Sequence, residues 1–511
     1  MRKTIALITA LCLIITLTAC QTSGADKTII SAVYFIPESE DDYYEFATFA
    51  IGEKPFDLEA EDQYPVFEDE TEYSPLDDMD GIQDYDLKSM VFTGQSVHGI
   101  PDEGVTSRWN HVSVYSENED ANFVDATCIY ETEHAFFYLD DRFSVDMEKL
   151  EEIAAGFEDE YEVIRRIFGN EGDVDANGKI RFLITSFDED TMGYYYSLDQ
   201  YSQEELERAG YDYKSNLSDM LYINVSIFSS DGSYTSADVV STLCHEFSHM
   251  AYMNNRASKA LDEEYLSFIV EGLAMWTEYY VGYPEGHDGY LYSYLSVADE
   301  ISFFTSDRSE IYGYGLLFFR YFGERFGTDA IIRLANSPYT EVAALEDASG
   351  VDADTLFEDF VYTVLATVTG LTDSEYYMEG LNDAESGFEL LSTAFEVLAD
   401  KEYGYYLEKG ESYYSYIMPP FSFALFFTES DPDFESDRAQ MIKVELRADF
   451  RNPYLNNLYT LKYNTCKYID RRIYVRRQEK RHLHSWRSFM INPCLSPWYF
   501  MGAGGWERQY F

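Results

Sequence analysis

Two parts of the chain carry apolar residues at helical spacing. In MEKLEEIAAGFEDEYEVIRRIF, which follows Asp146, apolar residues return every three or four positions, and Gly169 comes directly after the segment. This pattern predicts an amphipathic helix that ends at the glycine. Similar spacing dominates from about Thr235 to Thr369, which predicts a mainly helical region there.

Short apolar runs between turn residues predict strands elsewhere. Residues 28–140 contain runs such as SAVYFIP and MVFTG, separated by acidic turns. Two further strands are expected, one in DVDANGKIRFLITSF and one in LYINVSIF at 221–228. From residue 371 to about 447, tyrosine-rich alternation such as YGYYLEKGESYYSYIM predicts a small β-rich module.

Together these segments predict a protein of the α+β class with several domains. The chain has 511 residues, of which 46% are hydrophobic, and this is enough for a large buried core. We expect a signal peptide (1–19), an N-terminal β-rich region (20–140), a central domain (141–370), a C-terminal β-rich module (371–450) and a tail (451–511).

The first twenty residues have the pattern of an export signal. Arg2 and Lys3 precede an apolar run, residues 5–17, that is too short to span a bilayer. The run ends in LTAC, which resembles the lipobox of bacterial lipoproteins, where the cysteine is lipidated and becomes the mature N-terminus. The resemblance implies an extracytoplasmic protein that is anchored to a bacterial membrane by lipid on Cys20. A plain secretory signal is the alternative.

The net charge of −58 makes nucleic acid an improbable partner, because the bulk of the chain would repel a phosphate backbone. The last segment differs from the rest. Residues 451–511 contain eleven Lys or Arg against three Asp or Glu, whereas the preceding 450 residues contain 25 against 91. We interpret this tail as frame-shifted or disordered sequence, and a basic binding arm is the alternative.

A histidine pair stands out in LCHEFSHMAY at 243–252. With eight histidines in the chain, an HExxH pattern arises by chance in about one such sequence in a hundred. Thr235 and Asp238 match a capping box, so His245 and His249 are expected inside a helix and one turn apart. Two imidazoles so spaced can bind Zn²⁺, whereas Cys244 falls on the apolar stripe of the helix and is read as a core residue.

A catalytic zinc site needs a third protein ligand and an open position for water. Tyr252 and Asn255 occupy the glycine and histidine positions of HExxHxxGxxH, which excludes that pattern. The better candidate is Glu271, 22 residues after the second histidine in EEYLSFIVEGLAMWTEYYVG, where it shares a helix face with Glu278. A solvated surface charge is the alternative for Glu271. Gly272 suggests that the two helices that carry the candidate ligands approach each other closely at this point.

HEFSH followed at this distance by VEGLAMWTE resembles the glutamate zincins, in particular the hyicolysin-type bacterial metallopeptidases. DVDANGKIRFLIT, the GYYY turn, SDMLYINV and IYGYGLLFFRYFGERFG extend the resemblance over about residues 145–365. It implies a thermolysin-like zincin domain, with a mixed sheet over an active-site helix and a helical lower lobe. Val270 stands where this family usually has asparagine.

The resemblance also implies the roles of several residues. His245, His249 and Glu271 would hold Zn²⁺, and Glu246 would be the general base. A tyrosine from a later helix would stabilise the transition state, and Tyr312 is our choice for it, with a purely structural role as the alternative.

Aminopeptidases of the related single-zinc group carry a GxMEN-like strand that binds the amino terminus of the substrate. No such strand precedes the histidine pair, so the resemblance favours endopeptidase activity on protein or peptide substrates. An inactive zincin-like binding lipoprotein or adhesin is the rival function.

Tyr314 is the second candidate, after Tyr312, for the residue that stabilises the transition state. His287, in PEGHDG, is interpreted as a loop histidine.

A second segment matches part of a cation-binding loop. Asp173, Asp175, Asn177 and Gly178 match the first half of a calcium-binding loop, but Ile184 at the twelfth position cannot supply the bidentate carboxylate. A turn between helix and strand is the alternative, and Ca²⁺ binding requires ligands from elsewhere in the chain.

Overall fold

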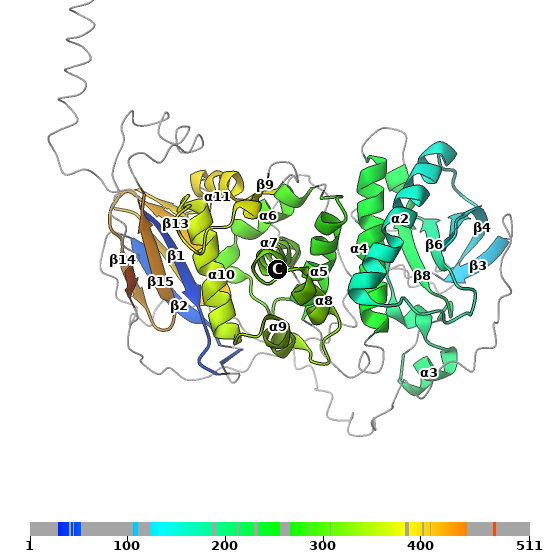
Figure 1. The fold of residues 1–511 in the computed structure, drawn as a ribbon, viewed down its shortest axis with the longest axis horizontal. Coiled ribbons are helices and arrows are strands. Elements are labelled where there is room, and N and C mark those ends of the chain that lie inside the picture. Colours follow the sequence, from blue (N-terminus) through cyan, green and yellow to red (C-terminus); the bar gives the residue numbers. More distant parts are fainter. Residues whose placement is uncertain are drawn as a thin grey trace, which may run out of the picture.

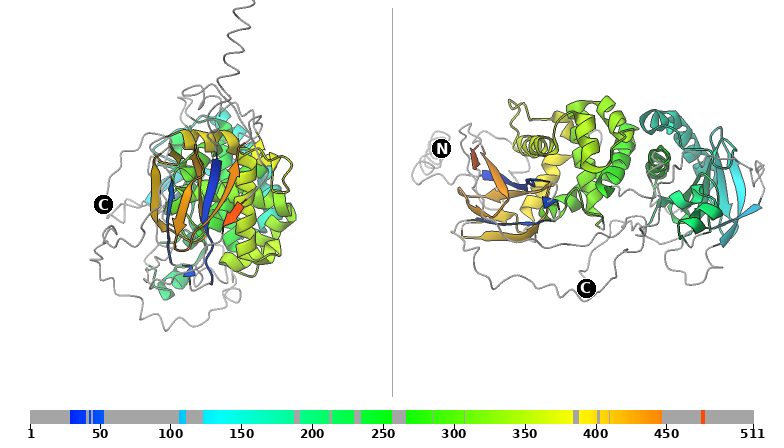
Figure 2. Two further views of the ribbon diagram at one scale, coloured as in Figure 1. Left: turned by 90° about the vertical axis from the view of Figure 1, so that its left-hand side faces the viewer. Right: turned by 90° about the horizontal axis from the view of Figure 1, so that it is seen from below.

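Three groups of elements follow one another along the long axis of the molecule (Figure 1). A mixed sheet lies at one end, helices fill the middle and a second group of strands lies at the other end, an order that the right-hand view of Figure 2 repeats. The computed structural model describes residues 29–39, 42–43, 45–52, 106–110, 123–186, 191–211, 214–228, 234–255, 266–284, 286–306, 308–383, 388–400, 403–408, 410–446 and 474–476.

Helix α2 (Met147–Phe168) has the bounds that its apolar spacing predicts. The side chain of Asp146 accepts a hydrogen bond from the backbone N–H of Glu148, which satisfies one of the free donors at the N-terminus. Gly169, at a φ of 93°, ends the helix. One face of α2 is buried throughout, so the prediction of an amphipathic helix here is confirmed.

The mixed sheet has six strands in the order β3-β4-β5-β6-β8-β7. Strands β5, β6 and β8 run parallel to one another, and the remaining pairs are antiparallel. Strand β7 therefore forms one edge of the sheet. The strands are β3 (Thr106–Asn110), β4 (Phe123–Glu131), β5 (Ala135–Asp140), β6 (Ile180–Thr185), β7 (Gly193–Tyr195) and β8 (Met220–Asn224).

One face of this sheet packs against α2 and against helix α4 (Ser236–Asn254). The ring of Phe182 on β6 lies 4.9 Å from that of Phe157 on α2, which in turn lies 5.5 Å from that of Phe247 on α4. Aromatic rings at such distances combine large apolar burial with favourable edge-to-face contacts. The sheet and α2 thus fix the position of α4, the helix that carries the histidine pair.

Helices fill the centre of the molecule, as the sequence predicts for residues 235–369. Short helix α3 (Gln203–Arg208) lies apart from them, beside the mixed sheet (Figure 1). The central helices after α4 are α5 (Ser267–Tyr280), α6 (His287–Leu295), α7 (Glu310–Phe326), α8 (Thr328–Ala335), α9 (Glu341–Ser349) and α10 (Ala353–Val368), and α11 (Leu390–Ala399) follows them.

The first and last described segments of the chain form the second group of strands together. Strand β1 (Ile29–Phe35) pairs with β13 (Ser422–Thr428) on one side and with β15 (Gln440–Glu445) on the other. Strand β2 (Ala47–Gly52) is likewise the central strand between β12 (Ser412–Met418) and β14 (Asp433–Ser436).

The strands expected in residues 20–140 are therefore divided between two sheets. Residues 29–35 and 47–52 join strands of the C-terminal module, whereas β3, β4 and β5 belong to the six-stranded sheet. Three short pairs complete the sheets: β11 (Tyr406–Leu407) on β13, β16 (Tyr474–Arg476) on β15, and β9 (Asn382–Asp383) with β10 (Phe388–Glu389).

The α+β class is confirmed by these mixed sheets and helices. Cys20, the signal segment, the MVFTG run and all of the tail except residues 474–476 lie outside the described residues. Among the helices that the structure describes, none has the length and apolar character needed to cross a membrane.

The joining of β2 to the C-terminal strands generates a prediction for Phe49. Its fully buried ring contacts Tyr413, Phe426 and Phe434, so Phe49→Ala should lower the free energy of unfolding by about 3–5 kcal/mol. Phe46→Ala is the matched control, because Phe46 is 50% exposed and its loss should change that free energy by less than about 0.5 kcal/mol. Denaturant unfolding measures both, and equal effects of the two variants would contradict the pairing.

Candidate metal centre

Helix α4 begins where the capping box predicts. The Thr235 hydroxyl accepts from the N–H of Asp238 at 3.2 Å, and the Asp238 carboxylate accepts from the N–H of Thr235 at 2.6 Å. Cys244 and Phe247 are fully buried on the apolar stripe of the helix. This confirms that Cys244 is a core residue, and burial raises the pKa of its thiol well above the ordinary value.

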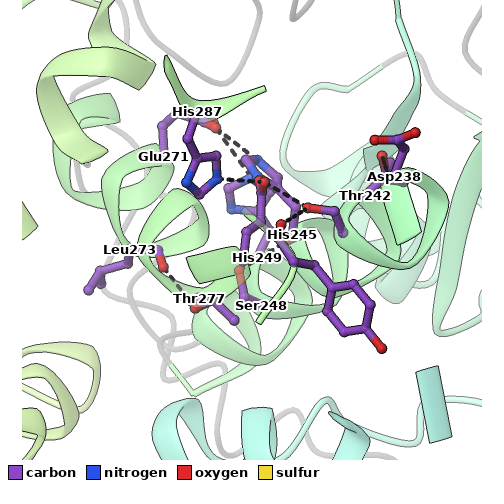
Figure 3. Close-up of polar contacts among 12 residues, drawn as sticks. Asp238, Thr242, His245, Ser248, His249, Glu271, Leu273, Thr277 and His287 are labelled. Atoms are coloured by element: carbon purple, nitrogen blue, oxygen red, sulfur yellow. Dashed lines mark hydrogen bonds and ion pairs between the residues drawn. The ribbon is translucent and has the colours of Figure 1, made fainter. Parts of the chain in front are cut away.

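Helix α5 brings Glu271 to both histidines (Figure 3). Its Oε2 lies 3.2 Å from Nε2 of His245 and 3.5 Å from Nε2 of His249. One ligand atom from each of the three residues lies within 4.8 Å of the other two. Glu271 is only 2% exposed, so the alternative of a solvated surface charge does not describe it.

This donor set can be tested against the geometry of Zn²⁺. At metal–ligand distances of about 2.0–2.1 Å, two ligands of a tetrahedral zinc ion lie about 3.3–3.4 Å apart. The two distances from Glu271 Oε2 to the imidazole nitrogens, 3.2 and 3.5 Å, lie on either side of this separation. Two imidazoles with one carboxylate is also a donor set typical of catalytic zinc. The residues therefore fit the ion.

The protonation states suit a cation as well. Burial raises the pKa of Glu271, but the charge of His249 and hydrogen bonds from both histidines outweigh burial and lower this pKa to about 2. Burial lowers the pKa of His245, but hydrogen bonds to Glu271 and Glu278 raise it well above the ordinary value. Such an anionic pocket holds a proton on His245, and a metal ion at Nε2 would displace that proton.

Glu278 lies behind His245, two helical turns after Glu271 on α5. Its Oε1 is 2.5 Å from Nδ1 of His245, and its Oε2 is 2.8 Å from the Ser241 hydroxyl. Burial raises the pKa of Glu278, whereas hydrogen bonds from His245 and His287 outweigh burial and lower this pKa to about 2. A carboxylate in this position fixes both the orientation and the tautomer of a metal-binding histidine.

The sequence interpretation of His287 as a loop histidine is wrong. His287 is the first residue of α6, it is fully buried, and its Nε2 lies 3.1 Å from Oε2 of Glu278. No local pattern marks it, because the contact depends on how α6 packs. For Glu278 a signal was present, since a carboxylate seven residues after Glu271 lies on the same helix face.

Glu246 faces the edge of the six-stranded sheet. It is 2% exposed, and its carboxylate accepts a hydrogen bond from the backbone N–H of Tyr195 on β7. Burial raises the pKa of Glu246, and the charges of His245 and His249 oppose this rise. A buried carboxyl with a raised pKa beside two imidazoles can accept a proton and return it.

Tyr312 lies at the candidate metal centre, whereas Tyr314 does not. The Tyr312 ring is 6.2 Å from that of His245, and its hydroxyl is hydrogen-bonded to Glu271. Burial first, and then the charge of Glu271, raises the pKa of Tyr312 well above the ordinary value. Tyr314 instead donates its hydroxyl proton to the backbone oxygen of Phe421, at 2.6 Å, inside the core.

Gly272 permits a close helix crossing, although not with the expected partner. A Cβ on Gly272 would lie 2.4 Å from the Phe319 ring and 2.9 Å from Cα of Gly315, both on α7. The close approach is therefore between α5 and α7, rather than between the two helices that carry the metal-site residues. It draws together the helices of Glu271 and Tyr312, which explains a glycine beside the third candidate ligand.

Two of the three residues expected to bind Ca²⁺ lie in a second acidic group. Asp173 and Asp175 approach Asp219 so that one oxygen from each lies within 4.8 Å of the others. Oδ1 of Asn177 accepts a hydrogen bond from the backbone N–H of Lys179. Asp175 already forms an ion pair with buried Arg181. Calcium binding stays a prediction.

Comparison with known proteins adds no assignment. No protein-family model matches the chain, and no curated protein matches it. The functional interpretation therefore rests on the chemistry of the metal centre and on the motif resemblance.

Proposed function

We propose that this protein is a zinc-dependent endopeptidase, a glutamate zincin similar to the hyicolysin type, which acts on extracellular proteins or peptides. The single observation that carries the proposal is the convergence of His245, His249 and Glu271, with the Glu246 carboxylate on the same helix as the histidines. The packing of α4 between a mixed sheet and a group of helices supports a thermolysin-like arrangement.

In this proposal two imidazoles and one carboxylate hold Zn²⁺. When bound, the ion supplies Lewis acidity, which polarises a peptide carbonyl and lowers the pKa of a water molecule toward neutrality. The hydrogen bond from His245 to Glu278 keeps Nε2 free to bind the ion.

Glu246 serves as the general base. Its carboxylate takes a proton from the attacking water and passes that proton to the amine that leaves when the peptide bond breaks. The backbone N–H of Tyr195 orients this carboxylate, and burial keeps its proton affinity higher than that of a surface glutamate. Without a substrate, Tyr312 donates to Glu271, and in the reaction it turns its hydroxyl toward the developing oxyanion.

The proposal also includes where the protein is located in the cell. Lipid on Cys20 would hold the enzyme on the outer side of a bacterial membrane, and the strong negative charge would keep it soluble there. A binding lipoprotein that keeps this fold without turnover is the alternative. An intact Glu246 argues against it, because binding alone does not need a general base.

Glu246→Gln tests the reaction. The variant keeps the shape of the side chain but loses its proton affinity, so casein cleavage should fall by about 10²- to 10⁴-fold while zinc is still bound. Glu151→Gln makes the same change at an exposed position on α2 and should leave cleavage unchanged. Activity is measured with zinc, with a chelator and after zinc is restored. Equal cleavage by the Glu246→Gln variant and the wild type would refute the proposed base.

Tyr312→Phe tests the transition-state role. Removal of one donor to an oxyanion should lower kcat by about 10²- to 10³-fold with little change in KM. Tyr314→Phe is the control, because it removes a hydroxyl of the same kind two residues away, whose partner is a backbone oxygen in the core. It should lower stability by about 1 kcal/mol and leave kcat unchanged. The role is refuted if both variants keep the wild-type kcat.

A further inference from the structure

A buried chain of polar groups leads away from the metal centre through three helices. From Nδ1 of His245 on α4 it passes to Glu278 on α5 and on to His287 on α6, with contacts of 2.5 and 3.1 Å. Figure 3 shows His287 beside His245. His287 is 0% exposed, and the role of a loop histidine cannot explain this burial.

The surroundings of His287 show which of its ring nitrogens donates a hydrogen bond. Within the described part of the chain, Nδ1 of His287 has no hydrogen-bond partner, whereas Nε2 faces the Glu278 carboxylate. A proton on Nδ1 would leave a buried donor unpaired. It would also turn the lone pair of Nε2 toward a lone pair of the Glu278 carboxylate. A proton on Nε2 instead makes a hydrogen bond and leaves only an unused acceptor at Nδ1. We therefore place the proton that faces Glu278 on Nε2.

Ser241 cannot take the place of His287. The Ser241 hydroxyl lies 2.8 Å from Oε2 of Glu278 and 2.8 Å from the backbone oxygen of Tyr283, but it has one proton and donates to one of them at a time. The N–H of His287 has no second acceptor among these contacts. It is the donor that stays on Oε2 whichever way the serine hydroxyl turns.

We propose that His287 is a positioning residue of the metal centre. By donating from Nε2 it holds the Glu278 carboxylate against His245, and this keeps the His245 proton on Nδ1 and the Nε2 lone pair available to the ion. The inference rests on the proposed function, because it takes Zn²⁺ as the group that binds Nε2 of His245.

Two substitutions at one position separate this role from packing. His287→Leu fills a similar volume but has no donor, whereas the amide of His287→Gln can donate from near the position of Nε2. The zinc dissociation constant of the full chain is measured by competition with a chromophoric chelator. The thermal unfolding of each metal-free variant serves as the folding control.

We expect His287→Leu to weaken zinc binding by about tenfold, and His287→Gln to remain within about threefold of the wild type. The metal-free His287→Gln variant should unfold near the wild-type temperature, and His287→Leu should stay folded but unfold somewhat lower, because Glu278 loses a buried donor. The inference is overturned if His287→Leu binds zinc as tightly as the wild type. It is also overturned if both variants lose affinity equally and unfold at lower temperature, because His287 would then act through packing alone.

A His245→Ala variant distinguishes failure of the proposed function from failure of the role proposed for His287. If the wild type binds zinc no more tightly than this variant, the proposed function fails, and the role of His287 fails with it. If the wild type binds zinc tightly, His245→Ala does not, and His287→Leu does, the proposed function stands and only the role of His287 is refuted.

Discussion

The proposed function depends on the position of one carboxylate. Glu271 lies 3.2 and 3.5 Å from two imidazole nitrogens that α4 presents one turn apart. Neither helix sets these distances alone. The six-stranded sheet and α2 hold α4 through edge-to-face aromatic contacts, and the crossing at Gly272 holds α5 against α7. Much of the interior thus serves to bring a residue of one helix to two residues of another.

This convergence has an electrostatic cost that a cation would relieve. Glu246, Glu271 and Glu278 are each no more than 7% exposed, and within the described residues the ion-pair partners of Glu271 and Glu278 are histidines. Buried carboxylates repel one another and lose their hydration, so the site is unfavourable without protons or a metal. A divalent ion would compensate much of this charge, and part of its binding free energy would then appear as stability of the fold.

Local patterns in the sequence predicted the parts of the site that lie within single helices. The capping box set the start of α4, helix phase separated Cys244 from the histidines, and the face shared by Glu271 and Glu278 follows from spacing along α5. The pairing of β1 and β2 with strands almost 400 residues away could not be predicted, because alternation shows that a strand exists but not which strand it joins. The burial of His287 was missed for the same reason, since it arises from packing between helices.

Zinc K-edge X-ray absorption on protein loaded with one equivalent of zinc tests the central claim most directly. We predict a first shell of two imidazole groups and oxygen donors at about 2.0–2.1 Å, four or five ligands in all. The imidazole scattering should disappear in a variant with His245→Ala and His249→Ala together. An oxygen-only shell in the wild type, or an unchanged imidazole signal in the double variant, would contradict the account.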